Sequence, residues 1–325
     1  ARAGINMSGG QFLVGTGVTI GVAGVATFRS GRIDVGDSLD NLSIGKLSGD
    51  AYTTGHGNVA MGRGSLTATT TGYNNTSLGR VALAVNTTGY ESVAVGAYAL
   101  DANTTGNQNT AMGYAALSAN VSGARNTGLA YGALSANTGS YNTGVGYNAL
   151  AANTTGANNT AVGYEALDAN TTASSNTAIG AAALGANTTG TQNVAVGNGA
   201  LDASNASNCT AIGYNSLGAN TTGTLNTAVG SEAFATNTTG GYNTAVGQNA
   251  LNANTTASNN TAVGQSALAA NTTGTRNSAF GQAALDAATT GDDNTAIGYA
   301  ALGANTTASD NTAVGSYALK NNTTG

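Results

Sequence analysis

A single 17-residue unit runs through most of the chain and limits the folds that it can form. The glycine that ends residues 159–163, NTAVG, recurs every 17 residues with two steps of 16, from Gly62 to Gly315, and only Ala130 replaces it. The sixteen copies share the pattern N-T-A-[VI]-G-Y-x-A-L-x-A-N-T-T-G-x-x, in which Asn159 is position 1 and Gly163 is position 5. A fixed period of this length is typical of a solenoid, in which each repeat buries its apolar side chains by stacking on its neighbours.

The residues that recur within the unit indicate β-structure. Position 4 is apolar in all sixteen copies, and position 9 is leucine in fifteen, with Phe234 in the other. A helical repeat needs more than about 30 residues for two packed helices, and glycine and asparagine recur too often here for helices. We therefore predict one coil of an all-β, parallel β-solenoid per unit. Each coil has a strand at positions 2–4, a bend at glycine 5, a second short strand at positions 8–11 and a turn at positions 12–15.

The alternation of side chains along a strand predicts which residues face the core. Positions 2 and 4 share one face of the first strand, so we expect Thr160, Val162 and their equivalents to point inward with Leu167, and Ala161 to point outward. The two 16-residue steps fall at turn sequences, at residues 137–140 and 204–209. Shortening a turn leaves the strand register unchanged, so we expect regular strands on both sides of each step.

The repeat also predicts how the chain is divided. We expect an N-terminal β segment and connector at residues 1–57, with short glycine-separated strands over residues 17–36, and the solenoid rod at residues 58–325. The final residues, NNTTG, stop inside a repeat without a capping sequence. Because an uncapped solenoid end exposes unpaired strand edges, we expect the rod to continue or to dock beyond Gly325.

The composition argues against catalysis. Only 7% of the residues are charged, His56 is the only histidine and Cys209 the only cysteine. Acidic residues such as Glu165 and Asp168 fall at different positions of the unit, so no recurring carboxylate pair of the glycosidase type is present. We predict no enzyme activity, no cofactor, and no catalytic, cofactor-binding or metal-binding residue; Cys209 is expected to be a small buried residue.

The same composition bears on partners. A chain with so few cations is a poor ligand for nucleic acid, and the chain has no run of 18 apolar residues that could form a membrane-spanning helix. We therefore predict neither nucleic acid nor a membrane as a partner.

Each coil carries only two large apolar side chains, each contributing about 1.5–3 kcal/mol on burial, against an ordering cost of about 1.5 kcal/mol per residue. We therefore expect parallel, in-register copies of the chain to pack around one axis. Their alanine faces would lie near that axis (Ala161, Ala178, Ala195 and Ala228), with the turns outside.

Tyrosine at position 6 forms a partial stripe that has two interpretations. It is either a sugar-stacking or adhesive contact surface, or an aromatic ladder on the sheet surface. The residues are Tyr114, Tyr131, Tyr147, Tyr164, Tyr214 and Tyr299.

The Asn-Thr-Thr turn also has two interpretations. The asparagine at position 12 could form a stacked amide ladder that satisfies backbone groups, or the triplet could accept N-linked glycans. The candidate acceptors are Asn86, Asn103, Asn153, Asn170, Asn187, Asn220, Asn237, Asn254, Asn271 and Asn305.

Three short segments carry a resemblance to a known family. The sequences NVAMG at 58–62, SVAVG at 92–96 and NVAVG at 193–197 resemble the head repeats of trimeric autotransporter adhesins, the YadA-like left-handed parallel β-roll. The longer unit is similar to repeats in tail-fibre and fibre-like adhesion proteins of bacteriophages and bacteria. The resemblance covers residues 58–325 and matches Thr160 and Val162 to the inward residues of the family motif. It implies a homotrimer of left-handed β-rolls that forms a stiff rod.

These observations predict a non-enzymatic, extracellular structural or adhesion fibre, either a virion fibre or a cell-surface appendage. Its expected partners are further copies of itself, in a homotrimer or an end-to-end filament, and a cell-surface glycan or receptor. The alternative is an ice-binding or other surface-binding threonine-rich β-solenoid, although the two turn threonines are adjacent and point opposite ways in an extended strand. An enzyme would need a substrate groove outside the repeats.

Overall fold

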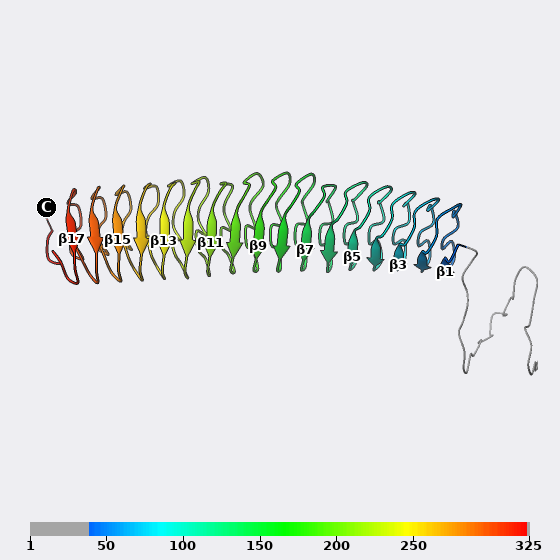
Figure 1. Cartoon of the computed structure of the whole chain (residues 1–325), viewed down its shortest axis with the longest axis horizontal. Coiled ribbons are helices and arrows are strands. Elements are labelled where there is room, and N and C mark those ends of the chain that lie inside the picture. The colour runs from blue at the N-terminus through cyan, green and yellow to red at the C-terminus, as the bar shows by residue number, and fades with distance from the viewer. Residues whose placement is uncertain (1–38, 324–325) are drawn as a thin grey trace, which may run out of the picture. The chain divides into compact units, whose positions relative to one another are not determined.

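The computed structural model describes residues 39–323, which form a regular stack of β-coils (Figure 1). All of them belong to one compact unit, Gly36–Gly325. The strands predicted over residues 17–36 and the chain end at Gly325 lie outside the described residues.

Each coil contributes one short strand to a single parallel sheet. Within residues 39–323 there are 17 strands of three residues each and no helix. Every strand pairs in parallel with the next one along the chain, which confirms the predicted all-β, parallel solenoid. The strands are β1 (Leu42–Ile44), β2 (Val59–Met61), β3 (Thr76–Leu78), β4 (Val93–Val95), β5 (Thr110–Met112), β6 (Thr127–Leu129), β7 (Thr143–Val145), β8 (Thr160–Val162), β9 (Thr177–Ile179), β10 (Val194–Val196), β11 (Thr210–Ile212), β12 (Thr227–Val229), β13 (Thr244–Val246), β14 (Thr261–Val263), β15 (Ser278–Phe280), β16 (Thr295–Ile297) and β17 (Thr312–Val314).

The described solenoid extends one coil further toward the N-terminus than the boundary predicted at residue 58. Strand β1 pairs with β2 in the same register as all later strands, Leu42 opposite Val59. The Oδ1 atom of Asn41 accepts a hydrogen bond from the backbone N–H of Asn58 at 2.9 Å, as the asparagines of later coils do. Residues 41–45, NLSIG, therefore belong to the repeat and not to a polar connector.

The strand faces are reversed relative to our expectation. Ala161 is fully buried, whereas Val162 is 36% exposed, so position 3 points into the coil and position 4 points out. The reason is space: a Cβ added at Gly128, which holds position 3 of β6, would lie only 3.3 Å from Cγ of Leu117 in the preceding coil. Because the leucine fills the interior beside position 3, only a small side chain fits there: alanine or glycine in β4–β17, and the buried Ser77 in β3. The prediction that Thr160 and Val162 face inward is wrong.

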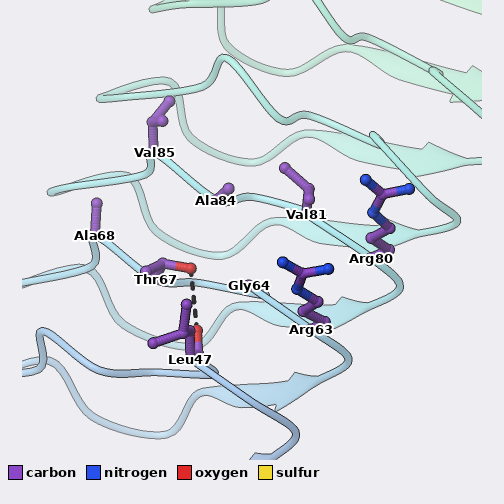
Figure 2. Close-up of a pocket in the computed structure, with 9 residues that line it drawn as sticks. All are labelled: Leu47, Arg63, Gly64, Thr67, Ala68, Arg80, Val81, Ala84 and Val85. Carbon is purple, nitrogen blue, oxygen red and sulfur yellow. Dashed lines mark hydrogen bonds between the residues drawn. The ribbon is translucent and has the colours of Figure 1, made fainter.

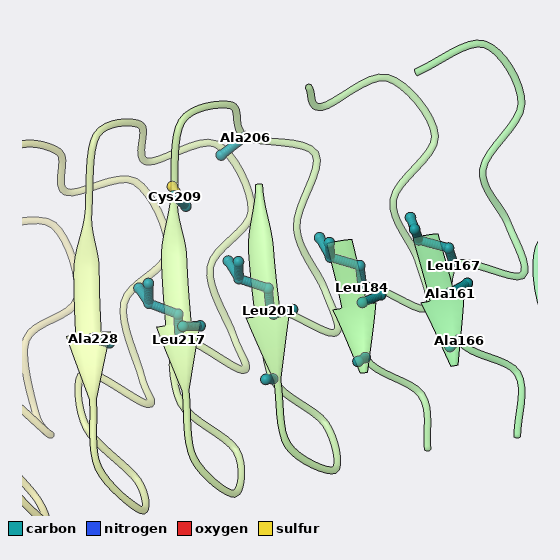
Figure 3. Close-up of a cluster of buried hydrophobic side chains, with 14 of the residues drawn as sticks. Ala161, Ala166, Leu167, Leu184, Leu201, Ala206, Cys209, Leu217 and Ala228 are labelled. Carbon is teal, nitrogen blue, oxygen red and sulfur yellow. The ribbon is translucent and has the colours of Figure 1, made fainter. Parts of the chain in front are cut away.

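The leucine column at position 9 forms the core, as predicted. Figure 3 shows Leu167, Leu184, Leu201 and Leu217, one from each successive coil. Every residue at this position from Leu66 to Leu302 is buried, including Phe234. Leu319, in the last described coil, is 52% exposed because no described coil stacks on it.

The second strand predicted at positions 8–11 is absent, and the chain turns there instead. Glu165 and Leu167 both adopt left-handed backbone conformations, each with φ of 51°, and such residues interrupt an extended strand. The turn still bonds to its neighbour, since the N–H of Leu167 donates to the carbonyl of Ala183 at 3.0 Å. Hydrogen bonding between coils and burial of the leucine together offset the cost of these conformations.

Glycine at position 5 is strongly favoured because the coils approach each other closely at the bend. Gly163 has φ of 141°, and a Cβ there would lie 2.5 Å from the carbonyl oxygen of Gly180. From Gly45 to Gly315, Ala130 is the one residue other than glycine at this position, and it is held at φ of 116°. An alanine in this region is strained, since side chains other than hydrogen avoid it.

We expect an Ala130→Gly variant to be more stable than the native chain by about 1 kcal/mol. The strain relieved in the folded state exceeds the entropic cost of ordering glycine, which is more flexible in the unfolded state. Urea unfolding followed by circular dichroism would measure the change. The matched reverse change, Gly163→Ala, is expected to destabilise the chain, and a stabilising Gly163→Ala would contradict this account of the bend.

Both 16-residue steps shorten a turn and leave the strands in register, as predicted. Thr127 pairs with Thr143 across the first step, and Val194 pairs with Thr210 across the second. In the second short turn, Oδ1 of Asn205 accepts the backbone N–H of Thr188 at 2.7 Å. In full-length coils a main-chain carbonyl takes this role, as when the N–H of Thr154 donates to the carbonyl of Thr171. The side chain of Asn205 thus accepts the N–H of the preceding coil in place of the main-chain carbonyl that accepts it in full-length coils.

Candidate interaction surface

The outward side of the sheet is a candidate interaction surface. We call it the strand face; it consists of the side chains at positions 2 and 4 of strands β1–β17. Position 4 holds Val, Ile, Leu, Met or Phe in every one of the 17 strands, and position 2 holds threonine in twelve of them. Because the strands are parallel and in register, each position forms a straight column along the stack.

The position 4 column of the strand face is apolar and largely exposed, and neither column carries a charge. No Asp, Glu, Lys or Arg lies at positions 2 or 4 of β1–β17. Nine side chains of the position 4 column are at least 36% exposed: Ile44, Leu78, Met112, Val162, Ile179, Ile212, Phe280, Ile297 and Val314. Single exposed apolar residues are normal, but a contiguous apolar surface marks a binding region.

The asparagines at position 12 are buried, and in part of the stack they bond to one another as a ladder. Nδ2 of Asn170 donates to the carbonyl of Ala173 at 3.1 Å and to Oδ1 of Asn153 in the preceding coil at 2.7 Å. All ten predicted glycan acceptors are fully buried, and the Nδ2 of each donates to the carbonyl three residues further on. The amide-ladder interpretation is confirmed for three runs of coils, which link Asn86 to Asn120, Asn137 to Asn187, and Asn220 to Asn237. Asn254, Asn271 and Asn305 bond to the carbonyl of their own turn and not to the preceding position 12 residue. In the folded coil none of the ten presents a free amide nitrogen to solvent.

A second asparagine ladder, at position 1, was not predicted. Oδ1 of Asn159 accepts the backbone N–H of Asn176 at 3.0 Å, and its Nδ2 donates to the carbonyl of Ala173 at 2.8 Å. The recurrence of asparagine just before each strand was the available signal. Cys209 occupies this position in one coil and is buried as expected, and burial raises the pKa of its thiol.

The tyrosine stripe forms a stacked row over part of its length. The ring centroids of Tyr114, Tyr131, Tyr147 and Tyr164 lie 5.3, 5.4 and 5.5 Å apart, with planes within 11° of parallel. The aromatic-ladder interpretation is confirmed for these four; Tyr214 and Tyr299 lie in coils further along and are also exposed. Because the rings cover each other's faces, the row presents mainly ring edges and hydroxyl groups. A second stack, of His56, Tyr73 and Tyr90, was not predicted; its ring centroids lie 5.2 and 4.9 Å apart.

The acidic residues do not gather into a site. Asp101, Asp168, Asp202 and Asp286 all lie at position 10, and loss of solvent on burial is the main cause that raises the pKa of each. Within the described part of the chain, no group of three or more His, Cys, Asp or Glu residues could hold a metal ion. The described residues thus present the strand face as the most extended feature that could act in recognition.

Comparison with known proteins assigns no family. No protein-family model matches the chain, and no curated protein matches it significantly. In residues 39–323 we find no helix with the length and apolar character needed to span a bilayer.

Proposed function

We propose that the chain is the rod of a non-enzymatic adhesion fibre, and that three copies associate along their strand faces. The observation that carries this proposal is the uncharged apolar column at position 4, which runs from Ile44 in β1 to Val314 in β17. A soluble monomer rarely exposes a contiguous apolar surface of such extent. Covering it would supply the burial that the narrow core of each coil lacks.

The occupant that best fits the strand face is another copy of the chain. The column repeats once per coil, at the spacing of about 4.8 Å between parallel strands. A parallel, in-register copy has the same spacing and can place an apolar side chain against each one along the rod. The contact proposed from the sequence was the alanine face, and that part was wrong because Ala161 and its equivalents are buried inside the coil. We therefore propose that the copies contact each other through the opposite, outward side of the strands.

The number of copies and the setting of the fibre follow from the resemblance to trimeric adhesins. It supports three copies, a left-handed coil and a place outside the cell, on a virion or a cell surface. The composition agrees with this role, since only 7% of the residues are charged and the exposed turns are rich in threonine. End-to-end association into a filament remains part of the proposal.

Sedimentation of the full chain tests the assembly. We expect a mass of three chains and elongated particles by electron microscopy. Replacing Val162, Ile179 and Val196 with glutamate places charges in the centre of the contact and should convert the trimer to monomer, because unpaired buried charges are costly.

The control keeps the number of added charges and moves them to the turns. Thr155, Thr172 and Thr189 are exposed at position 14, and a triple glutamate variant there should remain trimeric. A native chain that sediments as a monomer, or a trimer that survives the strand-face substitutions, would contradict the proposal.

The threonine column at position 2 supports a second candidate, an ice-binding surface. Unlike the turn threonines, Thr110, Thr127, Thr143 and their equivalents lie one per coil in a straight column on the outward side of a sheet. Against it, the neighbouring column varies from Val162 to Met112 and Phe280, which makes the face uneven. Thermal hysteresis in the purified chain would favour this candidate, and its absence would leave the fibre as the single proposal.

A further inference from the structure

A shallow pocket crosses the first three coils, beyond the bend that ends the strand face (Figure 2). It has a volume of about 420 Å³. Its apolar lining includes Leu47, Val81 and Val85, and Arg63 and Arg80 project beside them with parallel side chains. The pocket therefore combines an apolar floor with two cations.

The positive charge at this pocket is concentrated and unpaired. Lys46, Arg63 and Arg80 hold position 6 in three successive coils, although residues 39–323 contain only six lysines and arginines and the whole chain has a net charge of −5. Within the described residues, the ion pair found is that of Arg276 with Asp293, at 2.7 Å, and neither arginine of the pocket has one. The guanidinium of Arg80 lies 5.4 Å from the ring centre of Tyr98, a contact that holds it in place.

We propose that this pocket binds an acidic polysaccharide that lies along the stack; the inference deepens the proposed adhesion function and rests on it. Guanidinium groups bind carboxylates and sulfate esters through paired hydrogen bonds. The C–H faces of sugar rings can pack on Leu47, Val81 and Val85. An extended sugar chain with an acidic group on successive rings would meet one cation per coil, since the coils repeat at about 4.8 Å.

The geometry favours this ligand over other polyanions. The open, shallow pocket offers no enclosed cavity for an acyl chain. A single-stranded nucleic acid would need open aromatic faces on which its bases stack, but no aromatic side chain lines the pocket, and the ring of Tyr98 already carries Arg80 on one side. Repulsion from the net charge of −5 would further oppose a long polyanion elsewhere on the surface, which confines binding to this region.

Binding of defined polysaccharides to the full chain tests the proposal. The probes are oligogalacturonate, which carries carboxylates, and dextran sulfate, which carries sulfate esters, with neutral dextran as the reference; calorimetry at low and physiological salt gives the affinities. We expect one or both acidic probes to bind, and neutral dextran not to bind. A variant with Arg63→Gln and Arg80→Gln should bind the acidic probes at least about tenfold more weakly, because two charge-assisted contacts are lost.

Two further variants distinguish specific binding in this pocket from nonspecific charge attraction. Arg276→Gln removes a cation that is already neutralised by Asp293 and should leave the affinity unchanged. Val81→Ser with Val85→Ser keeps the cations but weakens the apolar floor, and should also reduce binding. Failure of both acidic probes to bind, equal loss in Arg276→Gln, or equal binding of single-stranded DNA would overturn the proposal. The sedimentation mass of each variant, measured in parallel, shows whether the fibre assembly itself has failed.

Discussion

A Leu167→Asp variant is expected to lose the ordered structure of its coil and to divide the solenoid into two separately unfolding parts. Leu167 is fully buried, and the coil interior offers no cation that could pair with a carboxylate there. We expect the free energy of unfolding to fall by more than about 4 kcal/mol, because the variant combines a lost apolar side chain with a buried charge. In a stack where each coil contacts only its neighbours, the damage stays local.

Hydrogen exchange measured by mass spectrometry would locate the effect. Amides in the coils on both sides of residue 167 should lose protection, while those near β2 and β16 keep it. The matched control is Thr172→Asp, which adds the same charge to an exposed turn five positions further on and should change little. Unchanged protection in Leu167→Asp would contradict the assignment of position 9 to the core.

An Asn159→Ala variant is expected to be destabilised by about 2–4 kcal/mol, since a buried donor loses its partner and a small cavity is left. The backbone N–H of Asn176, which now donates to Oδ1 of Asn159 at 3.0 Å, would have no acceptor. The carbonyl of Ala173 would lose one of its two side-chain donors but keep Nδ2 of Asn170. Urea denaturation would measure the loss.

The chain itself contains the control for the asparagine ladder. Ser92 occupies position 1 in one coil, where its Oγ accepts the backbone N–H of Asn109 at 3.2 Å. Asn159→Ser should therefore retain the acceptor and lose clearly less stability than Asn159→Ala. Equal losses of stability in the two variants would show that the asparagine stabilises the coil by filling space and not through its hydrogen bonds.

Several parts of the candidate surfaces could be predicted from the repeat, and others could not. The position 12 ladder and the tyrosine row follow from recurrence, because a residue repeated once per coil must lie beside its own equivalents. The pocket at Arg63 and Arg80 was missed because the first coil, which contributes Leu47, was assigned to a connector. Extending the frame back by 17 residues from Gly62 to Gly45 would have found that coil.

The sequence by itself determined the period, the parallel stacking of coils and the burial of Leu167 and its equivalents. It also determined that a turn can lose one residue without changing the strand register. These follow from spacing alone, since stacked repeats align identical positions. Which side of the strand faces inward was decided only by the tertiary structure. Alternation along Thr160, Ala161 and Val162 defines two faces, but not which of them is buried. The choice depends on the volume left beside Leu167 and the two asparagine ladders, and that volume admits a methyl group but not a valine side chain.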